Sequence, residues 1–76
     1  MPDKTYKLIE LVGVSEASVQ HAIRNAVARA SRSLKGLDWF EMTGVRGLIM
    51  DGKVSQFQVT IKVGFRIMDD SEVKGA

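Results

Sequence analysis

Four side chains of this sequence are candidates for binding chemistry. The single tryptophan, Trp39, lies among charged residues in the segment KGLDWFEMTGVRG. An indole is most often a packing residue, but one placed beside charge can also offer a broad aromatic face to another molecule. Gln58 carries both a hydrogen-bond donor and an acceptor. Arg46 and Arg66 can pair with carboxylates of a neighbour or bind a phosphate.

The sequence lacks the groups that catalysis or metal binding usually needs. It contains no cysteine, which excludes disulfides and thiolate metal sites, and the single His21 cannot build a multi-histidine site. No general base lies beside a nucleophile in a pattern typical of an active site. We therefore expect a binding or assembly protein rather than an enzyme.

Length and charge narrow the class of protein further. A chain of 76 residues predicts one domain, 1–76, that is only marginally stable alone, so association with further copies is the remaining source of stability. The net charge of +2 is too small to argue by itself for nucleic acid. No apolar run is long enough to span a membrane, and the first residues lack an apolar signal core, so we expect a cytoplasmic protein with no membrane partner.

The first half of the chain predicts a strand followed by one helix. The strand covers residues 4–12 and is bounded by Gly13. Ser15 is expected to cap the helix, with Glu16 favouring its dipole, and Gly36 is expected to follow its last turn. Between these signals, apolar residues recur at the spacing of one helix face: Val19, Ala22, Ile23, Ala26, Val27, Ala30 and Leu34.

The second half predicts a β-hairpin. Two long strands follow from Leu37, joined by an Asp-Gly turn at residues 51–52. Apolar and polar residues alternate strictly in the last strand, so one of its faces packs on the helix. The polar tail, residues 69–76, is expected to be flexible. The predicted fold is an α+β protomer of β-α-β-β order, whose sheet leaves one face open unless another copy covers it.

The alternation also assigns candidate residues to faces of the sheet. Phe40 and Met42 are expected to face the helix, which places Trp39 on the outer face together with Leu37. Gln58 falls on the outer face as well. Counting from the turn, Gln58 does not pair with Trp39, so the two can be neighbours only across a contact between copies.

Two glycines interrupt the middle strand. Gly44 and Gly47 indicate a bulge, a bend or a close approach by another backbone. A bulge resets the alternation, so the side on which Arg46 points stays open. One possibility is that it joins Arg66 on the outer face.

Taken together, these residues resemble the dodecins, small flavin-binding proteins of bacteria and archaea. The resemblance covers nearly the whole chain and rests on the order and spacing of the strings YKLIELVGVS, LDWFE, VRG and FQVTIKVGFRI. It implies a three-stranded antiparallel sheet wrapped around one helix. It also implies that the copies assemble into a hollow homododecamer.

The resemblance further implies a flavin site, with flavins bound in pairs between two subunits. The stacking tryptophan of the family falls on Trp39, and the glutamine that hydrogen-bonds the isoalloxazine edge falls on Gln58. Basic residues near the phosphate-bearing chain correspond to Arg46 and Arg66. Archaeal members lack a basic residue at the position of Arg46, which favours the bacterial type and FMN as the ligand, with riboflavin or FAD as alternatives.

A flavin site of this kind predicts storage, buffering or photoprotection of flavin, because a substrate has little access to a ring held between two indoles. Two other classes stay open. One is a basic β-sheet that binds nucleic acid, although the interspersed acidic residues and the lack of an aromatic cluster argue against that partner. The other is an assembly unit without a ligand, in which Trp39 only packs subunits together.

Overall fold

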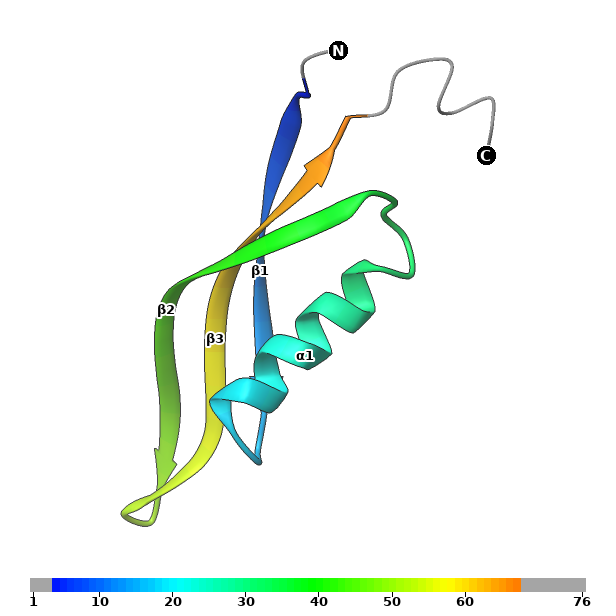
Figure 1. Ribbon diagram of the computed structural model, residues 1–76. Coiled ribbons are helices and arrows are strands. Elements are labelled where there is room, and N and C mark those ends of the chain that lie inside the picture. Colours follow the sequence, from blue (N-terminus) through cyan, green and yellow to red (C-terminus); the bar gives the residue numbers. More distant parts are fainter. Residues whose placement is uncertain (1–3, 68–76) are drawn as a thin grey trace.

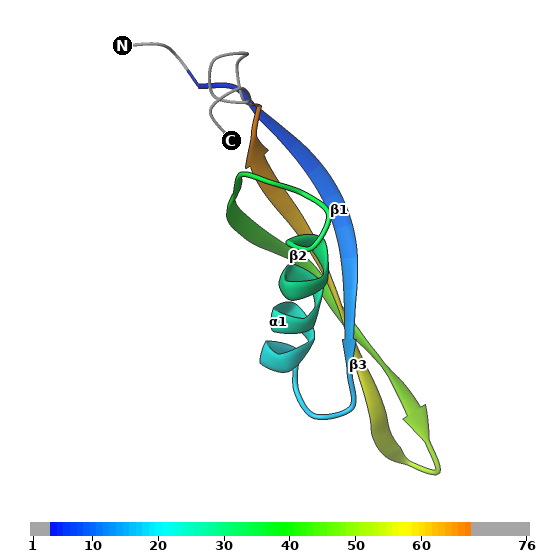
Figure 2. The ribbon, with the colours of Figure 1, turned by 90° about the vertical axis from the view of Figure 1, so that its right-hand side faces the viewer.

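The computed structural model describes residues 4–67, which form one antiparallel sheet with a helix on one face. The elements are, in chain order, β1 (Tyr6–Ser15), α1 (Val19–Ala30), β2 (Leu37–Met50) and β3 (Lys53–Arg66). The sheet order is β1-β3-β2, so the last strand lies in the middle. Figures 1 and 2 show the sheet twisting around the helix. The predicted α+β protomer of β-α-β-β order is confirmed, while the predicted flexible tail, 69–76, lies outside the described residues.

The core lies where β3 meets the helix. Val59, Ile61 and Val63 are alternate residues of β3, and each is at most 2% exposed. This is the burial that the predicted alternation requires of the face toward the helix. Ala22 and Ala26 pack against these side chains from α1, and their short side chains let the helix lie close to the sheet.

Helix and sheet lie very close together at Gly13. This residue lies opposite Val59 on the helix-facing side of β1. A Cβ built on it would collide with the carbonyl oxygen of Ala22 and lie 3.0 Å from the Cβ of Ala26. The sequence pattern ends the first strand at this glycine, but β1 continues through it to Ser15. Here the glycine serves a close packing contact rather than the end of a strand.

The helix begins later than the sequence pattern predicts. Its N-cap is Ser18, whose Oγ accepts a hydrogen bond from the N–H of His21 at 2.9 Å. The prediction of Ser15 as the cap is therefore wrong. Ser15 ends β1, and its Oγ accepts from the N–H of Ala17 at 2.9 Å in the turn before the helix. Glu16 consequently lies outside the first helical turn.

The helix also ends earlier than predicted. Ser31 is its C-cap: the Ser31 N–H bonds to the carbonyl of Val27 at 2.9 Å, and its Oγ donates to the carbonyl of Ala28 at 2.8 Å. These bonds satisfy carbonyls of the last turn. Gly36 does not end the helix. It has a φ of 79° in the loop before β2, where its carbonyl accepts from the N–H of Arg66 at 3.0 Å.

A tight turn joins β2 and β3, as predicted. Asp51 and Gly52 have φ values of 53° and 75°, which suit a two-residue hairpin turn with both central residues left-handed. Beyond the helix, the two strands continue as a projecting arm (Figures 1 and 2). This arm comprises residues 47–57, beyond the end of β1, and large apolar side chains on it are exposed: Leu48, Ile49, Met50 and Val54.

The pairing of β2 with β3 is irregular at three places. Register shifts lie between Leu37 and Trp39, Met42 and Gly44, and Leu48 and Ile49. The second shift confirms the irregularity predicted around Gly44. Gly47 keeps its register and lies close to the β3 backbone, since a Cβ on it would be 2.8 Å from the carbonyl oxygen of Gln56. Each shift changes the face of the sheet on which the following side chains of β2 project.

Candidate functional site

The structure places Trp39 on the face of the sheet that turns away from the helix. Trp39 pairs with Gly64, whereas Phe40 pairs with the buried Val63. Paired residues project on the same side of a sheet, so Phe40 faces the helix and Trp39 faces outward, as predicted. The prediction that Leu37 shares the face of Trp39 is wrong. Leu37 packs against the core, because the register shift before Trp39 inserts an extra residue.

The indole of Trp39 lies against the backbone of β3. A Cβ built on Gly64 would overlap the indole atoms Cε2 and Cζ2 and lie 2.8 Å from Nε1. The ring of Tyr6 stands beside the indole, with centroids 6.3 Å apart and planes tilted by 47°. Trp39 nevertheless stays 43% exposed. One side of the indole thus contacts the protein, and another side is exposed to solvent.

Tyr6 is itself fixed by a hydrogen bond. Its hydroxyl donates to Oδ2 of Asp38 at 2.6 Å. This bond, together with desolvation and the charge of the carboxylate, raises the pKa of the Tyr6 phenol, and the nearby Arg66 acts in the opposite direction. No role for Tyr6 or Gly64 was predicted from the sequence. The available signal was Gly64, a glycine inside an otherwise regular strand pattern.

Gln58 and Arg46 form a second group on the same face. They are directly paired in the sheet, which places Arg46 on the outer face. The Nε of Arg46 donates to Oε1 of Gln58 at 2.7 Å, and Nε2 of Gln58 donates to Oε1 of Gln56 at 2.9 Å. These two bonds assign the oxygen and nitrogen ends of the Gln58 amide. One acceptor position and one N–H of that amide remain for another molecule.

One chain does not bring all four candidate residues together. Trp39 pairs with Gly64, and Arg46 pairs with Gln58, six residues away along β3. At the rise of an antiparallel strand, this separation is about 20 Å. Arg66 lies only two residues from Gly64, at the Trp39 end of the face. The expectation that Trp39 and Gln58 are not neighbours within one chain is confirmed.

Apolar side chains are exposed between these two groups. Leu8, Val12 and Val14 of β1 pair with even-numbered residues of β3 and therefore share the outer face. Their exposed fractions are 49%, 58% and 42%. Large aliphatic side chains exposed together on one sheet face are typical of an interaction surface.

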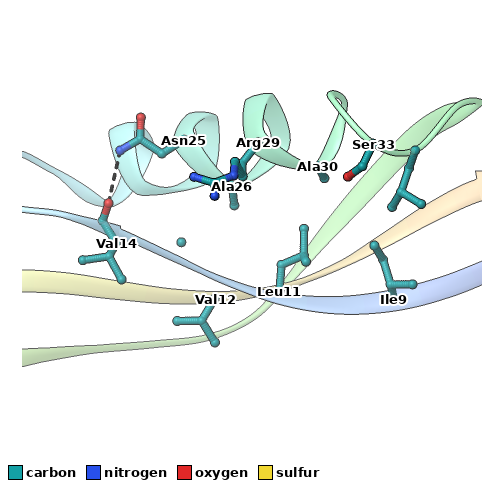
Figure 3. Close-up of a pocket in the computed structure, with 11 residues that line it drawn as sticks. Ile9, Leu11, Val12, Val14, Asn25, Ala26, Arg29, Ala30 and Ser33 are labelled. Atoms are coloured by element: carbon teal, nitrogen blue, oxygen red, sulfur yellow. Dashed lines mark hydrogen bonds between the residues drawn. The ribbon is translucent and has the colours of Figure 1, made fainter.

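A groove of about 370 Å³ lies on the other side of the sheet, between α1 and β1 (Figure 3). Ile9 and Leu11 point up toward the helix, and Asn25 Nδ2 donates to the carbonyl of Val14 at 3.1 Å. None of the four candidate residues lines this groove.

The described residues show neither a metal cluster nor a membrane helix. Between residues 4 and 67, no group of three or more His, Cys, Asp or Glu side chains is placed to hold a metal ion. In the same part of the chain, the helix is too short and too polar to cross a membrane.

Comparison with known proteins decides the family. The family model named Dodecin matches residues 5–68. This chain belongs to the dodecin family. The curated dodecin of Thermus thermophilus is 48% identical over 64 residues, which cover 84% of this chain and 93% of that protein.

Solved dodecin structures share the fold. The dodecin of Streptomyces coelicolor superposes with a TM-score of 0.86 at 51% identity, covering 92% of this chain and 100% of that chain. The dodecin of Streptomyces davaonensis has a TM-score of 0.86 at 47% identity, covering 90% of this chain and 100% of the other. The resemblance stated from the sequence is therefore confirmed at the level of family and protomer fold.

Proposed function

We propose that this dodecin binds flavin in sites shared between copies and holds it for storage, buffering or photoprotection. The ligand we favour is FMN, with riboflavin and FAD as alternatives, and Trp39, Gln58, Arg46 and Arg66 are the residues that bind it. The observation that carries the proposal is the partly exposed indole of Trp39 on the outer face, about 20 Å along the strands from Gln58. One copy cannot complete such a site, so residues of a second copy must contribute.

Self-association supplies that second copy, and the family implies a homododecamer. The exposed side chains of Leu8, Val12 and Val14 lie on the same face as the candidate residues. Covering them between copies removes apolar surface from water, which a domain of this size needs for stability. Assembly and ligand binding therefore use one surface.

The chemistry of the side chains suits a flavin. Isoalloxazine is flat, extended and electron-poor, and an indole face is large and electron-rich. One aromatic pair adds about 0.5–1.5 kcal/mol beyond its area burial, whereas micromolar binding needs about 8 kcal/mol. One indole therefore cannot supply the free energy of micromolar binding. Two indoles from two copies, with ligand rings stacked between them and with added polar contacts, come closer to it.

The polar residues supply orientation. The acceptor and N–H that remain on the Gln58 amide match the alternating carbonyl and N–H groups of the pyrimidine-like end of the flavin. Among the described residues, Arg46 bonds to Gln58 through Nε. Its two terminal nitrogens can then bind phosphate oxygens, which favours a phosphorylated flavin.

Structures of variants of the Thermus thermophilus dodecin support the choice of residues. Three such variants carry a tryptophan-to-phenylalanine change or one of two arginine-to-alanine changes. The altered positions are spaced by seven and 20 residues along that chain. Trp39, Arg46 and Arg66 have the same residue types at the same spacing.

A role in storage rather than catalysis follows from the sandwiched geometry that we propose. A ring stacked on both faces offers neither face to a second substrate. Electron transfer from indole to the excited flavin also quenches light-driven chemistry. Purified protein that oxidised a reduced nicotinamide through its bound flavin would contradict this role.

The test combines flavin titration with measurement of mass. Wild-type protein should quench riboflavin and FMN fluorescence and scatter light as a large multiple of its 8.4 kDa chain. Trp39→Ala should lose most of the flavin affinity while the mass stays the same. Arg66→Ala should weaken FMN binding roughly ten- to hundredfold more than riboflavin binding, because a hydrogen bond to a charged group contributes about 1.5–3 kcal/mol. Arg32→Ala, in the loop after the helix, is the matched control for loss of one positive charge.

Other outcomes would favour the competing functions. Dissociation of the Trp39→Ala assembly would assign the indole to subunit packing alone. Salt-sensitive binding of an oligonucleotide, with no quenching of flavin, would support the nucleic-acid reading.

A further inference from the structure

Two residues lie against the indole of Trp39 on its protein side, Tyr6 and Gly64, and a third, Asp38, holds Tyr6. Tyr6 comes from β1, Asp38 from β2 and Gly64 from β3. We call this group the indole support. Neither the family resemblance nor the residue pattern assigned a role in the site to any of its members.

Gly64 provides the surface on which the indole lies. The indole atoms Cε2 and Cζ2 occupy the space that a Cβ at this position would take. Any other residue would push the ring away from the sheet, because backbone and indole here have no free volume between them. Gly44 of β2, which pairs with Thr60, is different, since no atom of the chain lies within 4 Å of a Cβ built on it.

Tyr6 lies beside the indole, and Asp38 fixes Tyr6. The Tyr6 ring stands 6.3 Å from the indole, centroid to centroid, and the 2.6 Å bond from its hydroxyl to Asp38 Oδ2 fixes that ring. Asp38 immediately precedes Trp39, so the bond joins β1 to the backbone segment that carries the indole. The Tyr6 ring fixed in this way occupies the space beside the indole, which leaves Trp39 fewer alternative rotamers.

We propose that the indole support holds Trp39 in its stacking orientation before a ligand arrives, so that Tyr6, Asp38 and Gly64 are positioning residues for the flavin. The inference rests on the proposed function. Ordering a mobile side chain on binding costs affinity, and a surface that is already ordered avoids this loss. The exposed fraction of 43% leaves an indole surface free for a ring to stack on it.

The single tryptophan makes the inference directly measurable. Time-resolved fluorescence anisotropy of the ligand-free protein reports the motion of Trp39 alone. Tyr6→Phe keeps the aromatic ring but removes the hydroxyl that bonds to Asp38. We expect a larger fast component of depolarisation, unchanged mass by light scattering, and riboflavin binding weaker by roughly two- to tenfold, the loss that follows from ordering one side chain.

Matched variants separate positioning from general damage. Asp38→Asn keeps an acceptor for the Tyr6 hydroxyl and should stay close to wild type, whereas Asp38→Ala should behave like Tyr6→Phe. Gly64→Ala should displace the indole, change the near-ultraviolet circular dichroism of Trp39 and weaken riboflavin binding. Gly44→Ala adds the same methyl group to β2, where no atom of its own chain lies within 4 Å, and should leave the near-ultraviolet circular dichroism of Trp39 unchanged.

The outcomes distinguish this inference from the proposed function. If wild-type protein binds riboflavin and Tyr6→Phe changes neither anisotropy nor affinity, the positioning role is overturned while the flavin site stands. If wild-type protein binds no flavin, the proposed function fails, and a restrained indole then serves packing alone, which overturns the inference as well. A loss of mass in Tyr6→Phe would assign the contact to the subunit interface and would also overturn it.

Discussion

At the scale of single residues, neighbouring side chains decide what each candidate can do. Gln58 is a polar residue on a strand, which by pattern alone is usually just solvated. In the structure its amide is oriented by Arg46 on one end and Gln56 on the other. Orientation by neighbours turns a general hydrogen-bonding group into one that presents a defined donor and acceptor.

The phenol of Tyr6 is expected to ionise only above its ordinary pKa of 10.0. The hydrogen bond to Asp38 favours the neutral phenol, desolvation and the carboxylate charge act in the same direction, and Arg66 opposes them. Because the pKa of the folded state is raised, the stabilising contribution is complete below pH 10.0. It is lost as the pH rises through the raised pKa of the folded state.

Phenolate absorbance measures this shift without ambiguity, because Tyr6 is the single tyrosine of the chain. Asp38→Ala should move the titration of the folded protein to lower pH, toward that of the unfolded chain. Asp38→Asn removes the charge but keeps the acceptor, and should give an intermediate result. A wild-type titration midpoint at or below that of the unfolded chain would show that the bond to Asp38 does not control the phenol.

At the scale of elements, the contact between α1 and β1 depends on the absence of side chains. Gly13 brings the strand backbone against the carbonyl of Ala22, and Ala26 lies beside it. Ala22 and Ala26 are also buried in the core with residues of β3. Helix, edge strand and central strand are therefore packed as one unit, and the projecting hairpin arm is left outside it.

Gly13→Ala is expected to destabilise the protein by about 1–3 kcal/mol, because the added methyl group forces helix and strand apart. Gly44→Ala is the control, since its methyl group would meet nothing within 4 Å. Denaturation midpoints compared at one protein concentration measure the difference, because the stability of an oligomer depends on concentration. Equal midpoints for the two variants would show that the helix does not depend on this close contact.

At the scale of the whole molecule, the outer face joins assembly to ligand binding. Residues 4–67 form an elongated unit, with principal extents of 55 × 20 × 13 Å, and the single helix covers only one face of the sheet. Both the apolar residues of β1 and the four candidate residues lie on the uncovered face. A change that prevents copies from meeting there should therefore remove the flavin sites together with the assembly.

Val12→Asp is expected to dissociate the assembly, because it places a charge among apolar side chains of the proposed contact. Val12→Thr has nearly the same shape and should cause a much smaller loss. Light scattering reports mass and riboflavin quenching reports the site, and both should fall together in Val12→Asp. A full-size Val12→Asp particle would show that this part of the face stays in solvent.

The ends of the helix show where local signals stop being sufficient. Ser15 and Ser18 both have cap chemistry, but Ser15 pairs with Phe57 as the last residue of β1, and Ser18 caps the helix. Ser31 ends it before the glycine that local rules favour. The presence of the helix and of the strands was predictable because it follows from the periodicity of apolar residues. The ends of the helix depend on competing cap residues of similar strength, so they were not.

The sequence by itself determined the order of elements, the hairpin turn at residues 51–52 and the outward side of Trp39, because alternation and turn chemistry are local properties. It also carried the strings that resemble the dodecins. Only the tertiary structure decided which side chains meet: Tyr6 beside Trp39, Arg46 beside Gln58, and the separation between these pairs. Register between distant strands sets these contacts. Gly44 marked one of the three irregularities in β2, but the shifts after Leu37 and Leu48 had no local signal.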